Sequence, residues 1–213
     1  MRHVILVPGL GLGGIELLML KSRLRKAGLD ARIYYYWPWR RSIDEYARRL
    51  ATYVKNSLLR DPDFVAHSLG GLVVARMCAS DPERVGCRVV TLGSPHVGCE
   101  AASRFKRVPG GAWLLGRGLR TALEQAPIGF PSAVKVGTIA GNLDAGLGWL
   151  LGIRRPNDSV VCVDEAHHPR ATETMTLKVS HTAMLISKRV ANEVDHFLKH
   201  KRFSGSKEGV AQQ

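Results

Sequence analysis

The chain has 213 residues, of which 45% are hydrophobic and 23% are charged, and neither an internal repeat nor a Pro- and Ser-rich linker divides it. A chain of this length can bury roughly 70% of its unfolded surface around one core, so we expect one compact domain rather than several. The formal net charge is +13, but the basic residues fall in scattered pairs such as Arg40-Arg41 and Lys188-Arg189, which favours solubility or attraction to an anionic lipid surface over nucleic-acid binding.

The first 37 residues read as strand, loop, helix and strand. An apolar run over His3–Val7 predicts the first strand, and the glycine-rich loop 8–14 follows it. An apolar stripe predicts the next helix and is formed by Leu17, Leu20, Leu24 and Ala27. Gly28 is expected to end this helix. The aromatic run 33–37 predicts the second strand, with Asp30 before it.

The most informative stretch begins after a helix that Ser42 is expected to cap and that should reach about Arg60. Residues 64–66 are β-prone and residues 69–79 are helix-prone, so Ser68 lies at a strand-to-helix turn. Such a turn is a nucleophile elbow, which exposes its serine hydroxyl at the end of a sheet strand. The crowded backbone requires small residues two positions before and after the serine, and Ala66 and Gly70 meet that requirement.

The remaining elements continue the alternation of strands and helices. Three further strands are expected over Arg88–Leu92, Ala133–Ala140 and Thr174–Val179. A closing helix should bury an apolar stripe of Ile186, Val190, Val194 and Phe197. This alternation predicts an α/β fold, with a mainly parallel central sheet of about six strands and helices on both faces.

A serine hydroxyl needs a base that takes its proton during attack, and the base needs a carboxylate that fixes its tautomer. In enzymes with an elbow, the acid and then the histidine follow the serine along the chain. Asp158 and His181 occupy that order after Ser68, and both lie in loops at expected strand ends. The sequence therefore predicts a triad of Ser68, Asp158 and His181, with Asp144 as the competing acid.

Two backbone amides are candidates to hold the oxyanion that forms during such a reaction. The amide of Leu69 lies in the first turn of the helix after the serine, where the partial positive charge of the helix end helps. The second amide should come from the loop after the first strand, where Gly9 allows close approach. The place of Leu10 directly after Gly9 favours its amide over that of Gly11 as the second oxyanion donor.

The same loop supports a rival interpretation, because Gly9, Gly11 and Gly14 form a G-x-G-x-x-G pattern between a strand and a helix. That pattern is typical of dinucleotide binding, but it also needs an acidic residue at the end of the second strand. The expected second strand ends in aromatic residues. We therefore expect no dinucleotide cofactor.

Five segments together resemble the α/β-hydrolase superfamily, and within it the small bacterial esterases and triacylglycerol-lipase-like proteins. They span nearly the whole chain in the order of that superfamily and are Leu6–Gly9, Ala66–Gly71, Leu92–Gly98, Asn157–Val161 and Ser180–Leu185. The resemblance implies that Ser68 is the nucleophile, Asp158 the acid, His181 the base, and Leu10 and Leu69 the oxyanion donors. The chain departs from the common pattern at Ala66, which replaces a glycine, and in the segment 143–157.

The resemblance implies a serine hydrolase of carboxylic esters that needs no cofactor and no metal, with a small-molecule or lipid ester as substrate. A thioesterase or acyltransferase of the same fold, and a binding module that has lost turnover, are the alternatives. Apolar residues in segments 93–133 and 143–157 either line an acyl pocket under a minimal cap or simply cover the sheet. They include Trp113, Leu114, Leu115, Leu119, Leu123, Leu143, Leu147, Trp149, Leu150 and Ile153.

Four cysteines, Cys78, Cys87, Cys99 and Cys162, show no metal-binding spacing, so we expect free buried thiols. No signal-peptide core and no run of 18 apolar residues is present, so we expect a cytoplasmic protein. The domain is expected over residues 1–203, followed by a disordered tail over 204–213. His67 and His96 are expected to be structural, His167 and His168 a loop pair, and His196 and His200 exposed on the last helix rather than metal ligands.

Overall fold

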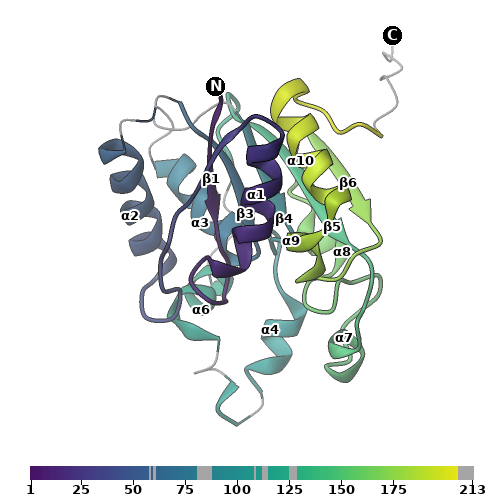
Figure 1. The fold of residues 1–213 in the computed structure, drawn as a ribbon. Helices are drawn as coiled ribbons and strands as arrows, with labels where there is room; N and C mark the ends of the chain where they lie inside the picture. The colour runs from purple at the N-terminus through teal and green to yellow at the C-terminus, as the bar shows by residue number, and fades with distance from the viewer. Residues whose placement is uncertain are drawn as a thin grey trace.

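The computed structural model describes residues 1–57, 59, 61–80, 88–107, 109–111, 115–124 and 129–205. Its centre is a sheet of six parallel strands in the order β2-β1-β3-β4-β5-β6 (Figure 1). The strands are β1 (His3–Val7), β2 (Asp30–Ile33), β3 (Asp63–His67), β4 (Arg88–Leu92), β5 (Lys135–Gly141) and β6 (Glu173–Leu177). Because all six are parallel, their carboxyl ends meet at one edge of the sheet, and the predicted six-stranded α/β architecture is confirmed.

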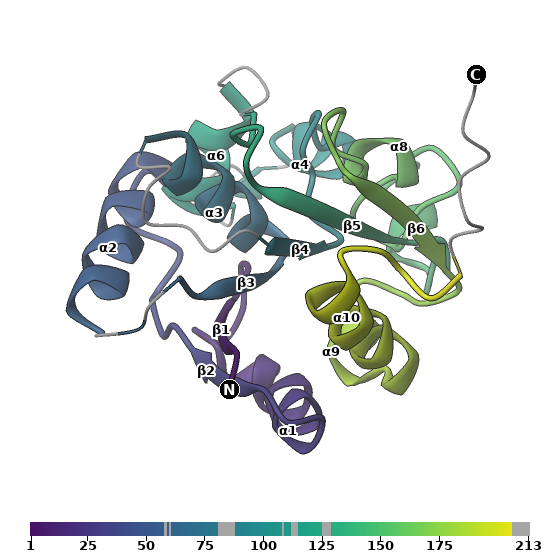
Figure 2. The same ribbon diagram turned by 90° about the horizontal axis from the view of Figure 1, so that it is seen from above.

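Helices cover both faces of the sheet (Figure 2), with α2, α3 and α6 over one face and α1 and α10 over the other. The helices are η1 (Ile15–Leu17), α1 (Leu18–Lys26), α2 (Ile43–Asn56), α3 (Leu69–Ser80), α4 (Glu100–Phe105), α6 (Gly116–Glu124), α7 (Leu147–Leu150), α8 (Val163–Ala166), α9 (Ala183–Ile186) and α10 (Lys188–His200). Short α4 and α7 follow β4 and β5 and lie beyond the carboxyl edge of the sheet, at the bottom of Figure 1.

The strand sequences explain this layering. In β1, Ile5 and Val7 pack into the core cluster under α2 and α3, whereas Val4 and Leu6 pack into the cluster under α1 and α10. Side chains alternate between the two faces of a strand, so a strand that is covered on both sides must be apolar throughout. The continuous apolar runs of the sequence are therefore what a doubly covered parallel sheet requires.

Local sequence signals explain where α2 begins and where α1 ends. Ser42 caps α2 in a capping box, because its Oγ accepts from the amide of Glu45 at 3.3 Å and its own amide donates to Glu45 Oε2 at 3.0 Å. Gly28 follows Ala27, the C-cap residue of α1, and has a φ of +88°. Glycine adopts this backbone conformation without strain.

The second strand was predicted in the wrong place. It covers Asp30–Ile33 rather than 33–37, and Asp30 is its first residue instead of preceding it. The partner strand β1 sets this limit, because Leu6 pairs with Ile33 and accepts from the amide of Tyr34, after which β1 ends near Pro8. The tyrosines therefore lie in irregular chain, where no neighbouring strand remains to pair with them.

Other boundaries differ by smaller amounts. Helix α2 ends at Asn56 and not near Arg60, because Ser57 bonds back to the carbonyl of Val54 through both its amide and its Oγ. Ile186 was expected on the buried stripe of the last helix, but it ends α9 and is exposed. The chain restarts as α10 after Ser187, which is the N-cap of that helix.

Ser204 hydrogen-bonds to Glu193 of α10, and residues 206–213 of the expected tail lie outside the described residues. Within the described part of the chain, no helix has both the length and the apolar character that crossing a bilayer requires.

Candidate active site

Ser68 connects β3 directly to α3 at the carboxyl edge of the sheet, as the elbow interpretation predicts. Its φ of +53° lies in the left-handed region that non-glycine residues rarely adopt. The amide of Ser68 donates to Leu92 O at 2.9 Å, which fixes the turn to β4. A Cβ on Gly70 would lie 2.4 Å from Val7 O, so only glycine permits this contact between the elbow and β1. Such strain at a partly buried serine is typical of functional sites.

Asp158 and His181 form a buried pair at the same edge. His181 Nδ1 lies 2.8 Å from Asp158 Oδ2, and the two residues are 8% and 1% exposed. A second bond joins the amide of His181 to the carbonyl oxygen of Asp158 at 2.8 Å. Because a carboxylate only accepts, Nδ1 carries the proton and Nε2 keeps its lone pair. The ring is thereby prepared to act as a base through Nε2.

The loop around Asp158 holds the carboxylate in place. Asp158 Oδ1 accepts from the amides of Val160 and Val161 at 3.0 and 2.8 Å, which leaves Oδ2 for the histidine. Asn157 is buried beside it and accepts from the amide of Ser159 at 2.8 Å. Val160 and Val161 therefore hold the Asp158 carboxylate through their backbone amides.

Gly93 is a site residue whose role sequence reasoning missed. Its φ is +54°, and a Cβ there would lie 2.9 Å from Asp158 Oδ2 and 3.1 Å from His181 Nδ1. Any side chain at this position would push the pair apart. The Leu92-Gly93-Ser94 segment carried the only available signal, a glycine directly after a buried strand.

His67 lies beside the proposed base and supports it. Its ring centroid is 4.6 Å from that of His181, and its Nε2 donates to His181 O at 3.1 Å. Burial, and secondarily the neighbouring imidazole of His181, lower the pKa of His67 to about 3. His67 is therefore neutral at physiological pH and holds the backbone of the His181 loop.

The loop after β1 packs onto the elbow. A Cβ on Gly9 would lie 2.6 Å from Ser68 Cβ and 3.2 Å from Ser68 Oγ, so the next amide, that of Leu10, is adjacent to the serine. Tyr36 donates its hydroxyl to Pro8 O at 2.8 Å and fixes this loop. Leu69 is the first residue of α3, and the amide of a first helical residue has no partner within its helix.

Asp144 does not contact His181 in the structure. Its Oδ1 accepts from the amides of Gly146 and Gly148 at 2.9 and 3.1 Å, where it orders the start of α7. Although partial burial raises the pKa of Asp144, these backbone hydrogen bonds outweigh that effect and lower it. The geometry brings Asp158, and not Asp144, to the histidine.

The glycine loop is poorly suited to a pyrophosphate. The side chain of Glu16 accepts from the amide of Gly14 at 3.0 Å, and its carboxylate would lie 2.6 Å from a Cβ on Gly11. Asp30, at the amino end of β2, bonds instead to His3 and Arg32. A carboxylate inside the loop would repel an anionic cofactor.

The other histidines have structural surroundings. His96 is buried, lies 3.0 Å from Thr91 Oγ1 through its Nε2, and contacts the rings of Phe130 and His168. His196 is hydrogen-bonded through Nδ1 to Arg202 O. Among the residues that the structure describes, no cluster of His, Cys, Asp and Glu has the arrangement of a metal site.

Three cysteines are buried free thiols, as predicted, namely Cys78, Cys99 and Cys162. Cys87 lies outside the described residues. Burial raises the pKa of the Cys99 and Cys162 thiols to about 12 and also raises that of Cys78, so none is a ready nucleophile.

The two apolar segments near the site divide between core and surface. Leu115, Leu119 and Ile153 are buried in the core, whereas Trp149 and Leu150 of α7 are exposed. Leu143 and Leu147 are also largely exposed. Trp113 and Leu114, and the side chain of Leu123, lie outside what the structure describes.

Sequence comparison finds no protein family and no curated protein that matches this chain. Solved structures do match. The lipase BlEst2 of Bacillus licheniformis in its mature form is 20% identical and superposes with a TM-score of 0.75, over 93% of this chain and 91% of the lipase. A metagenomic carboxyl esterase is 20% identical with a TM-score of 0.63, over 89% of this chain and 72% of the esterase. The NocB thioesterase domain is 16% identical with a TM-score of 0.60, over 93% and 94% of the two chains.

The chain has the α/β-hydrolase fold, as the resemblance in its sequence implies. At these identities the likeness establishes the fold, while the chemistry rests on the residues of the site.

Proposed function

We propose that the protein is a serine hydrolase that cleaves carboxylic esters through an acyl-enzyme on Ser68. One observation carries the proposal: the buried Asp158–His181 pair lies at the same sheet edge as a serine held at a strained strand-to-helix turn. A buried aspartate that fixes the tautomer of a histidine is the arrangement that activates a serine. The esterases, lipases and thioesterases that share the fold agree with this chemistry.

In the first half of the reaction, Ser68 Oγ attacks the ester carbonyl carbon while His181 Nε2 takes the hydroxyl proton. The carbonyl π electrons move to oxygen, and the amides of Leu10 and Leu69 stabilise the resulting oxyanion. Asp158 stabilises the imidazolium. The intermediate then collapses, the ester C–O bond breaks, and His181 returns the proton to the departing alcohol.

In the second half, His181 takes a proton from water, and the hydroxide equivalent attacks the acyl-enzyme carbonyl. Collapse of this second intermediate releases the carboxylic acid, and the proton returns to Ser68 Oγ. This sequence uses only groups of the chain and water. A thiol ester would follow the same steps with a thiol as leaving group.

A fluorophosphonate probe tests the central claim, because only an activated serine attacks its phosphorus at a useful rate. Peptide mapping should find the label on Ser68, and Ser68→Ala should abolish labelling. Ser180→Ala is the matched control, since Ser180 is half-exposed beside His181 but has no role in the mechanism. Labelling elsewhere, or none, would mean that the fold serves another purpose, including binding without turnover.

Turnover of the wild-type chain separates the ester reaction from its alternatives. A chain-length series of aryl esters, assayed beside the corresponding thioesters, should show the higher kcat/KM for the oxygen esters. Ser68→Ala and His181→Ala should each lower kcat by up to about 10⁶, and the double variant should be scarcely worse. A clear preference for thioesters would reassign the protein to the thioesterase alternative.

A further inference from the structure

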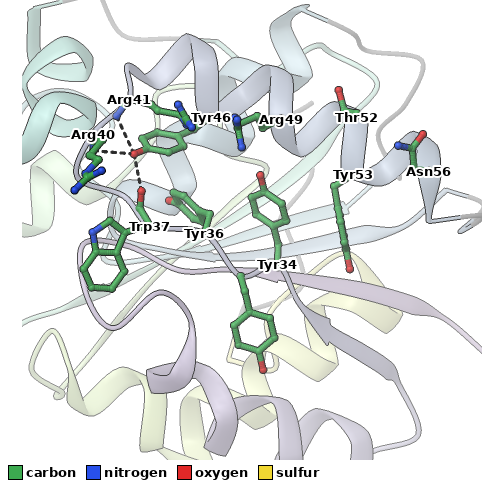
Figure 3. A pocket seen from close by; sticks show the side chains of 11 residues that line it. Tyr34, Tyr36, Trp37, Arg40, Arg41, Tyr46, Arg49, Thr52, Tyr53 and Asn56 are labelled. Carbon is green, nitrogen blue, oxygen red and sulfur yellow. Dashed lines mark hydrogen bonds between the residues drawn. The ribbon is translucent and has the colours of Figure 1, made fainter.

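A cavity of about 680 Å³ lies between α2 and the segment that follows β2 (Figure 3). None of Ser68, Asp158 and His181 lines it, so it is distinct from the proposed catalytic site. The lining residues come from the end of β2 through most of α2 and are Tyr34, Tyr35, Tyr36, Trp37, Arg40, Arg41, Tyr46, Arg49, Thr52, Tyr53 and Asn56.

The lining of the cavity carries an excess of positive charge. Arg40, Arg41 and Arg49 line it, and no lining residue is acidic. In the part of the chain that the structure describes, none of these arginines forms an ion pair. Of the two acids in the first turn of α2, Asp44 pairs with Arg76, whereas Glu45 bonds to Ser42 and also attracts Arg41 electrostatically, so the excess positive charge comes chiefly from Arg40 and Arg49. The cavity therefore attracts an anion.

Packed tyrosines form a rigid wall of the cavity. Neighbouring rings are in contact, with centroids 4.9 to 5.3 Å apart, in the order Tyr53, Tyr34, Tyr36 and Tyr46. The hydroxyl of Tyr46 accepts from the amides of Arg40 and Arg41 and donates to Trp37 O, so it orders the turn that carries the arginines.

One hydroxyl of this wall remains available beside the arginines. Among the described contacts, the hydroxyl of Tyr34 has no hydrogen-bond partner, and Figure 3 shows it pointing toward Arg49, whereas that of Tyr53 points away from the arginines. Phenol donors beside guanidinium groups are suited to phosphate oxygens.

Exposed apolar and aromatic side chains lie on one side of the cavity. Trp37 and Tyr35 are 59% and 57% exposed, and Leu12 and Ile15 of the preceding loop are 65% and 59% exposed. The loop lies against these aromatics, because a Cβ on Gly13 would be 3.7 Å from the ring of Trp37. Nucleic-acid sites also combine arginine and aromatic rings, but exposed leucine and isoleucine beside a cationic cavity suit the boundary between lipid headgroups and acyl chains.

We propose that this cavity binds the phosphate of an anionic phospholipid headgroup, with Trp37 and the loop 12–15 entering the interfacial layer. Arg40, Arg41 and Arg49 neutralise the phosphate, and Tyr34 donates a hydrogen bond to one of its oxygens. Because Tyr36 of the same wall bonds to Pro8 O, the site lies next to the loop that packs on Ser68. The protein would thus bind an anionic bilayer through the surface formed by the cavity, Trp37 and the loop 12–15.

Vesicle sedimentation tests the proposal directly. The full chain with Ser68→Ala, which cannot turn over lipid by the proposed route, should bind vesicles of mixed phosphatidylcholine and phosphatidylglycerol and should not bind pure phosphatidylcholine. A nearby basic residue is worth about fivefold in binding to an anionic leaflet, so Arg40→Gln/Arg41→Gln/Arg49→Gln should weaken binding roughly 100-fold.

Arg25→Gln/Arg170→Gln/Arg189→Gln is the matched control, because it removes the same charge from exposed positions outside the cavity. It should weaken binding by less than about threefold. Equal losses in the two triple variants would show diffuse attraction and overturn the site. Soluble ester hydrolysis by the cavity variant in the wild-type background should be unchanged, which checks its folding and separates this proposal from the catalytic one.

Tryptophan replacement locates the contact with the membrane. Trp37→Ala should weaken vesicle binding more than Trp149→Ala, although Trp149 is the more exposed of the two. The opposite order would place the contact on α7 and contradict the proposal.

Competition with soluble ligands separates a membrane site from other phosphate sites, and glycerol phosphate and a single-stranded oligoribonucleotide are the competitors to add to the vesicle assay. Displacement from vesicles by either at low concentration would identify a soluble phosphate or a nucleic acid as the ligand instead.

Discussion

At the residue scale, two aspartates near one edge of the sheet differ in what they bind. Asp158 accepts two backbone amides through one oxygen and faces His181 with the other. Asp144 uses its Oδ1 to order the start of α7. A carboxylate can support the imidazolium only if it reaches the ring, so this difference assigns distinct roles to residues that the sequence left as alternatives.

Replacement of each acid by its amide tests these roles. Asp158→Asn should lower kcat by about 10² to 10⁴, because the amide cannot stabilise the imidazolium and favours the wrong tautomer. Asp144→Asn should leave kcat within about threefold, since its carboxylate orders the start of α7 and does not contact His181. Steady-state kinetics on one aryl ester measures both, and an inactive Asp144→Asn beside a nearly normal Asp158→Asn would require a different acid.

Gly93 gives a second prediction at this scale. Gly93→Ala should reduce kcat by at least about 10²-fold, because a Cβ there would displace the Asp158–His181 pair and misplaced catalytic groups lose rate steeply. Gly98→Ala is the control, since Gly98 also has a positive φ but open space around it. If both variants kept full turnover, the pair would not need its present position.

At the element scale, α2 depends on its first turn. Ser42→Ala removes the side-chain half of the capping box and should lower the free energy of unfolding by about 1 kcal/mol. Thr52→Ala, an exposed change on the same helix, should stay within about 0.5 kcal/mol. Urea denaturation of the three proteins gives the comparison. Equal midpoints would show that α2 does not rely on this cap.

Elements with a complete local signal were predictable, and those that depend on a partner strand were not. The strands His3–Val7 and Arg88–Leu92 and the start of α3 agree with the sequence, because continuous apolar runs and the elbow pattern mark them. The second strand was misplaced because its end depends on where β1 stops pairing, which no local pattern records.

The site follows the same division. Chain order and loop context predict Ser68, Asp158 and His181, and the structure brings the last two into contact. The contributions of Gly93 and His67 could not be read, because they arise from packing between segments distant in sequence. The residue type alone does not reveal that a glycine leaves space for a neighbouring pair, or that a histidine binds a backbone carbonyl.

At the scale of the whole molecule, buried histidines make stability depend on pH. Burial lowers the pKa of both His67 and His96 to about 3, while in the unfolded chain each has a pKa of about 6.5. Between these values the unfolded state binds more protons than the native state, so stability is complete above about pH 6.5 and falls as the pH drops.

We therefore expect the free energy of unfolding to fall by about 1.4 kcal/mol per histidine between pH 7.5 and 5.5. This window lies above the ordinary titration range of carboxyl groups. His96→Leu should show a shallower fall by about that amount, whatever its absolute stability. Urea midpoints at several pH values give the slope, and parallel slopes for variant and wild type would mean that folding does not lower the pKa of His96.

The wholly parallel sheet has a consequence for how the chain reaches this structure. None of its strand pairs is a hairpin, since even Phe64 and Val89, partners in adjacent β3 and β4, are separated by the whole of α3. Strand β1 leaves the ribosome first, yet its central partner β3 begins only at Asp63. Loop closure must precede each such pairing, which slows folding of non-local topologies to milliseconds or longer. The newly made β1, apolar on both faces, can pair with β2 on one edge only, so its other edge must wait for β3. A chaperone that shields this edge should raise the yield of active protein more than one that acts on the finished chain.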